Sequence, residues 1–73
     1  MAPAERIDVI EGNVGWIVTN HHQVPRSFLS SHEAVAMAIF EAKRLATEGS
    51  VAEVHVWRDG KSEMVFEAGP SMK

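Results

Sequence analysis

The sequence has no cysteine among its 73 residues, so disulfide bonds and thiolate zinc sites are excluded. Disulfides, bound metals and oligomerisation are the usual means of stabilising a chain this short, which buries only about 60% of its unfolded surface. The absence of cysteine also fits a reducing compartment. We therefore expect a cytoplasmic protein, and we consider oligomerisation below.

Long apolar runs are missing as well. No stretch approaches the roughly 20 apolar residues that span a bilayer. The N-terminal sequence MAPAERID has no apolar segment typical of a signal peptide. No helical pattern combines a basic and an apolar face in the way that favours binding to membrane surfaces. We therefore expect no contact with a membrane.

Positive charge is scarce, since seven Lys and Arg residues stand against ten Asp and Glu residues and the formal net charge is −3. Affinity for nucleic acids rests largely on neutralising phosphates with basic side chains. Nucleic acid is therefore disfavoured as a partner. Single-stranded nucleic acid stays open as an alternative, because aromatic side chains on a sheet face can stack bases and His55, Trp57 and Phe66 share one predicted face.

Patterns for catalysis and metal binding are also absent. The four histidines lack the spacing that places metal ligands on one helical face; they are His21, His22, His32 and His55. Three serines near His32 do not form a Gly-x-Ser-x-Gly nucleophile motif. We predict no catalytic residue, no metal site and no cofactor, and we expect that the protein is not an enzyme.

One long helical pattern is present, from Ser30 to Gly49. Ser30 followed by Glu33 fits a capping box, and Gly49 suits the left-handed residue that ends many helices. Six apolar residues fall on one stripe at helical spacing, namely Val35, Ala38, Ile39, Ala42, Leu45 and Ala46. Because the stripe is rich in alanine, we expect a sheet to pack closely against it. We expect Ile39 and Leu45 to be buried there.

The first hairpin is predicted around Gly12-Asn13, between the strand-like segments 6–11 and 15–20. This dipeptide is typical of a two-residue turn. Such a turn pairs residue 9 with residue 16 and residue 7 with residue 18, and it buries Trp16 and Val18 on the face toward the helix. Ile10 and Ile17 then lie on the other face.

The second hairpin is predicted around Asp59-Gly60, which follows the alternating segment 51–57. Asp-Gly is among the strongest signals for a two-residue type I′ turn. This turn pairs Val54 with Val65 and residue 56 with residue 63, so Val54 and Val56 face the helix. A short strand near residues 26–29 is also expected, at a sheet edge because Pro25 lacks a backbone donor.

The predicted order of elements is ββ(β)αββ. This is an α+β domain, in which a mainly antiparallel sheet carries one helix on one face. We place the single domain at residues 6–67, between a flexible N-terminal lead, residues 1–5, and a flexible C-terminal tail, residues 68–73.

Several segments together resemble one family of small, mostly bacterial proteins, classed as domain of unknown function 2188. The segments are GWIV at 15–18, SHEA at 31–34 and VHVWRDGK at 54–61, with small residues recurring along the helix between the last two. The resemblance covers about residues 7–66. It implies the same α+β fold and no definite chemistry, since the family has no established activity.

One helix covers only one face of a sheet, so the predicted registers leave an apolar set on the other face. This candidate interface comprises Ile10, Ile17, His55, Trp57, Met64 and Phe66. Soluble monomers rarely expose an apolar surface of that size. We therefore predict a non-catalytic interaction module that forms a homodimer.

The sequence leaves open three alternatives to a homodimer formed through this face. An unidentified partner protein, rather than a second copy, could bind the face. The tail 67–73 could fold back over it. Met37 and Phe40, which fall among the charged residues of the helix, form a secondary candidate interface.

Overall fold

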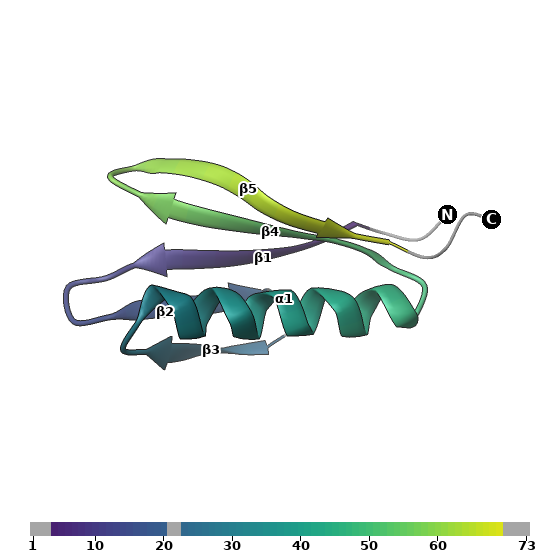
Figure 1. The fold of residues 1–73 in the computed structure, drawn as a ribbon, viewed down its shortest axis with the longest axis horizontal. Helices are drawn as coiled ribbons and strands as arrows, with labels where there is room; N and C mark the ends of the chain where they lie inside the picture. Colours follow the sequence, from purple (N-terminus) through teal and green to yellow (C-terminus); the bar gives the residue numbers. More distant parts are fainter. Residues whose placement is uncertain (1–3, 21–22, 70–73) are drawn as a thin grey trace.

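The computed structural model describes residues 4–20 and 23–69. Five strands and one helix follow in the order β1 (Ala4–Glu11), β2 (Trp16–Asn20), β3 (Gln23–Phe28), α1 (Ser31–Thr47), β4 (Val51–Arg58) and β5 (Lys61–Ala68). The strands form one sheet, and α1 lies along one face of it (Figure 1). The predicted α+β class and the ββ(β)αββ order are confirmed.

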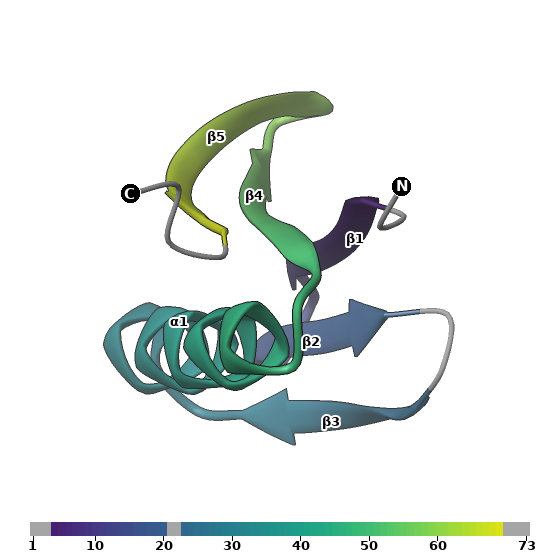
Figure 2. The same cartoon turned by 90° about the vertical axis from the view of Figure 1, so that its right-hand side faces the viewer.

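The sheet has the strand order β3-β2-β1-β4-β5. Consecutive strands pair antiparallel, whereas β1 and β4 pair in parallel at its centre. The parallel pair arises because the chain leaves β3, runs through α1 and returns beside β1, and parallel neighbours need such a long connection. Seen end-on, the sheet curves around α1, with β3 and β5 at its edges (Figure 2).

Both predicted ends of the helix are confirmed. The Ser30 hydroxyl accepts a hydrogen bond from the Glu33 backbone N–H at 3.2 Å. At the other end, Gly49 has a φ of +94°, and the backbone N–H groups of Gly49 and Ser50 donate to the carbonyls of Ala46 and Leu45. These two bonds make a Schellman motif, so local sequence determines where the helix begins and ends.

The core lies between α1 and the sheet face that it covers, which we call the covered face. Its strand residues are Ile7, Val9, Val18, Ala52, Val54 and Val56, and its helix residues are Ala34, Ala38 and Ala42. The three helical alanines are 0% exposed. They recur every four residues, so they form the line of closest approach between helix and sheet.

Three residues that we expected in the core, Trp16, Ile39 and Leu45, are only partly buried. The contact line runs through the small alanines, so larger side chains on either side of it reach the rim of the helix–sheet contact. Trp16 lies beneath the guanidinium group of Arg58, 5.4 Å from the ring centroid. The predicted stripe therefore lies to one side of the observed contact line, which runs through Ala34, Ala38 and Ala42.

The predicted two-residue turn at Gly12-Asn13 is wrong. The β1–β2 connection is a loop of residues 12–15, and Val9 pairs with Val18 instead of Trp16. The Gly12 N–H donates to the Gly15 carbonyl at 2.7 Å across this loop. Because the pairing moves by an even number of residues, each side chain keeps its predicted face.

Position 15 needs glycine because the backbone of the edge strand β3 passes close to it. A Cβ atom at this position would lie 2.5 Å from the Phe28 carbonyl oxygen of β3. Strand β3 begins three residues before the predicted segment 26–29 and ends one residue earlier. It is an edge strand, as the position of Pro25 predicts.

The turn of the second hairpin is confirmed, whereas its distal register is wrong. Asp59 and Gly60 have φ values of +52° and +77°, as a type I′ turn requires. Beyond the pair of residues 56 and 63, a β-bulge shifts the register, so Val54 pairs with Phe66. A bulge sets two residues against one, so Val65 is the extra residue of β5.

The strands extend slightly beyond the predicted domain limits of 6–67. Strand β1 begins at Ala4, where it pairs with Val51, and β5 ends at Ala68, which pairs with Ala52. The remaining residues of the predicted lead, 1–3, and residues 70–73 of the predicted tail lie outside the described residues.

Candidate interaction surface

The face opposite α1, which we call the open face, is the main candidate surface. Its residues follow from the strand registers, because side chains alternate between the two faces of a sheet. Residues 6, 8 and 10 of β1 pair with residues 53, 55 and 57 of β4, while residues 5, 7 and 9 point to the covered face. Within residues 4–20 and 23–69, α1 is the only helix, so this part of the chain supplies no second layer over the open face.

The first of three rows across the open face is apolar. In this apolar row Ile10 pairs with Ile17 on one side and with Trp57 on the other. Ile10 and Ile17 are each 37% exposed. A hollow of about 380 Å³ opens beside Ile10 and Trp57, toward the Asp59-Gly60 turn. The row therefore leaves apolar surface accessible at the end of the sheet near the Asp59-Gly60 turn.

The middle row contains Asp8, His55 and Met64, which are neighbours across β1, β4 and β5. One oxygen of the Asp8 carboxylate, Oδ1, accepts hydrogen bonds from Trp57 Nε1 at 2.9 Å and from Arg6 Nε at 3.0 Å. These bonds hold the indole of Trp57 against the sheet, and the Arg6 guanidinium lies 5.8 Å from its ring centroid.

The third row is charged. Arg6 pairs with Glu53, and Glu53 pairs in turn with Glu67 of β5. The Glu53 Oε1 atom lies 2.9 Å from His55 Nε2, and the two side chains are 34% and 15% exposed. The open face thus changes from apolar to charged along the strands, with both signs of charge side by side in this charged row.

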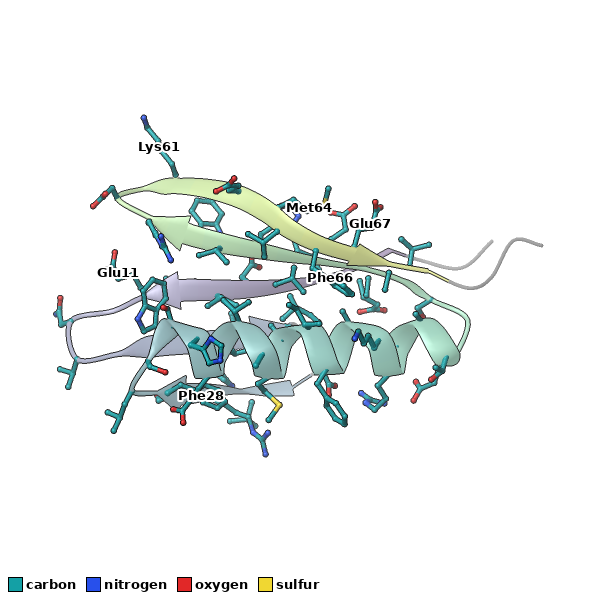
Figure 3. The ribbon with its side chains drawn as sticks, in the orientation of Figure 1. Glu11, Phe28, Lys61, Met64, Phe66 and Glu67 are labelled. Carbon is teal, nitrogen blue, oxygen red and sulfur yellow. The ribbon has the colours of Figure 1, made fainter. Side chains whose placement is uncertain are left out.

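Five of the six residues predicted for the interface share the open face: Ile10, Ile17, His55, Trp57 and Met64. The sixth assignment, Phe66, is wrong. The bulge turns Phe66 to the covered face, where it packs against the core with Lys43 Nζ 5.9 Å from its ring. Figure 3 shows Phe66 directed toward α1, whereas Met64 projects from β5 away from α1.

Arg6 is the open-face residue that sequence reasoning missed. The alternation that places Asp8 and Ile10 on this face also places Arg6 there. Its importance depends on the parallel pairing of β1 with β4, which sets Arg6 beside Glu53. Two strands so far apart in the chain carry no turn signal that predicts their register.

The secondary candidate surface on the helix is weaker than the open face. Phe40 is 64% exposed, but Met37 is partly buried, and its Sδ lies 4.0 Å from Arg26 Nη1 of β3. Val24 of β3 is 83% exposed on the same side of the molecule, near Met37 and Arg26. This side therefore presents single apolar side chains among charges instead of a continuous row.

The described residues hold no cluster of side chains with the arrangement of a metal site. Across residues 4–20 and 23–69, no three His, Cys, Asp or Glu side chains gather in a way that could hold a metal ion. His32 is exposed at the first turn of α1, and His21 and His22 lie outside the described residues. Within the same ranges, α1 is too short and too polar to cross a membrane.

Comparison with protein-family models, curated proteins and solved structures finds no match for this chain.

Proposed function

We propose that the protein is a non-catalytic interaction module that forms a homodimer through its open face. The observation that carries this proposal is the apolar row, formed by Ile10, Ile17 and Trp57 on three adjacent strands. A domain of this size has little core, and burial of such a row between two copies adds stability. The predicted kinship with the domain of unknown function 2188 family stays a prediction and assigns no activity.

Charge favours a second copy over other occupants. Arg6 and Glu53 lie side by side on adjacent strands, so a partner of one sign would oppose one of them. A second copy carries both signs and can place each charge against its opposite. Single-stranded nucleic acid fits less well, because Asp8 is bound to Trp57 and the same face carries the carboxylates of Glu53 and Glu67, which would repel phosphates.

Analytical ultracentrifugation at tens of micromolar tests the proposal. We expect a dimer for the natural sequence. Trp57→Glu should yield monomers, because it places a carboxylate in the apolar row next to Asp8. Phe40→Glu is the matched control: it makes the same kind of change at a residue that is 64% exposed on the helix, and the dimer should persist.

Two outcomes would contradict the proposal. A single species of 8.0 kDa for the natural sequence would show that the chain is a monomer. Dissociation by Phe40→Glu, with a stable dimer for Trp57→Glu, would move the interface to the helix. Circular dichroism of both variants checks that α1 remains folded.

A further inference from the structure

The relative orientation of the two copies can be derived from the parallel pair at the centre of the sheet, on the premise that the open face forms the dimer proposed above. Strands β1 and β4 place three residue pairs side by side: Arg6 with Glu53, Asp8 with His55, and Ile10 with Trp57. Each pair belongs to a different row. In the charged row and the middle row, the residue from β1 and the residue from β4 differ in chemical character.

A two-fold axis between stacked sheets lies in the plane of the interface, and its direction and position decide which rows meet. An axis across the strands through the middle row sets the apolar row of one copy on the charged row of the other, and one through the apolar row leaves both charged rows unopposed. In neither case does Arg6 or Glu53 meet an opposite charge of the other copy, so the interface gains no charge pairs. This direction is therefore disfavoured.

An axis along the strands sets each row on its own copy. If the axis runs along β1 itself, Arg6 meets Arg6 and Asp8 meets Asp8, so like charges oppose each other. If it runs along β4, Glu53 meets Glu53. If it runs midway between β1 and β4, every residue of β1 lies over the residue of β4 that is its own neighbour in the sheet.

We propose that the dimer axis runs along the strands, midway between β1 and β4. Arg6 of each copy then faces Glu53 of the other, Asp8 faces His55, and Ile10 faces Trp57. The charged row becomes a cluster of two guanidinium groups and two carboxylates with alternating signs. Stacked sheets cross at about 30°, so contact is closest at the centre, where β1 and β4 lie.

Charge reversal of the two positions tests this arrangement. In the dimer of Arg6→Glu the cluster holds only carboxylates, and in the dimer of Glu53→Arg it holds only guanidinium groups. Each variant alone should dimerise at least about tenfold more weakly than the natural sequence, because close charge pairs across an interface are strongly coupled. An equimolar mixture of the two should recover dimers, since each reversed charge then meets its opposite.

Native mass spectrometry of the mixture distinguishes the heterodimer from the two homodimers by mass. The double variant Arg6→Glu/Glu53→Arg should also dimerise by itself. Lys61→Glu is the control: it makes the same change of charge at an exposed residue whose neighbour is Arg58, outside the three rows, and dimerisation should be unchanged.

The result separates this inference from the proposal on which it rests. A monomeric natural sequence would overturn self-association itself. A dimeric natural sequence whose two variants fail to combine in the mixture would overturn the orientation and leave self-association standing.

A second measurement applies if charge reversal unfolds either variant, and it uses the absence of cysteine from the chain. Arg6→Cys mixed with Glu53→Cys should cross-link through a short thiol reagent more efficiently than either variant alone. Equal cross-linking in all three samples would contradict the proposed axis.

Discussion

The two faces of the sheet use similar side chains to different ends. Ile7 and Ile10 belong to the same strand, yet Ile7 is 1% exposed on the covered face and Ile10 is 37% exposed on the open face. The difference comes from α1, which packs its alanine line against one face only. An apolar side chain on a strand is therefore structural or available for binding according to which face the helix covers.

The polar groups of the open face show the same contrast. The Asp8 carboxylate is bound by Trp57 and Arg6, and Glu53 lies beside His55, so these groups satisfy one another within the plane of the sheet. A second copy can therefore bury them without leaving them unpaired, which lowers the cost of forming an interface. On the covered face few polar side chains need a partner, because most of the buried side chains there are apolar.

The largest expected effect comes from matched substitutions in β1. Ile7→Ala should lower the free energy of unfolding by about 2–5 kcal/mol, as truncations in a packed core do. Ile10→Ala should change monomer stability by less than about 1 kcal/mol, because its side chain already contacts water, and should weaken the dimer. Urea unfolding at low protein concentration measures both values. Equal losses would mean that the open face is covered in the monomer.

A smaller effect is expected from enlarging the alanines of α1. Ala38→Leu should cost about 1–3 kcal/mol, because it forces the helix away from the sheet. Ala36→Leu, on the exposed side of the same helix, should be almost neutral. Thermal unfolding followed by circular dichroism compares them. Equal thermal stability of the Ala38→Leu and Ala36→Leu variants would contradict the close approach of α1 to the sheet.

The smallest effect concerns the two sides of β5. Phe66→Ala should destabilise the fold by about 1–2 kcal/mol, because the ring is only partly buried against the core, and should leave dimerisation unchanged. Met64→Ala should do the reverse, since Met64 is 48% exposed on the open face. Chemical unfolding and sedimentation of the two variants give the comparison. If Phe66→Ala weakened the dimer and Met64→Ala did not, Phe66 would belong to the interface and its assignment to the covered face would be wrong.

Local signals in the sequence determined much of this protein. Ser30 and Gly49 mark the ends of α1 because each satisfies backbone groups within its own turn of helix. Asp59-Gly60 determines the second turn because both residues accept a positive φ. Strict alternation then sets which residues of β1, β2 and β4 share a face, including four of the six predicted interface residues. The even displacement of the first hairpin left those faces intact.

Only the tertiary structure decided the rest, because it depends on contacts between segments distant in the chain. The bulge in β5 brings Phe66 against the core under α1, and no short pattern predicts which residue a sheet will pass over. Gly15 is needed because of the Phe28 carbonyl on another strand. Above all, the parallel pairing of β1 with β4 sets Arg6 beside Glu53. Strands joined through a helix carry no turn to fix their register, so the arrangement of charge on the open face belongs to the tertiary structure.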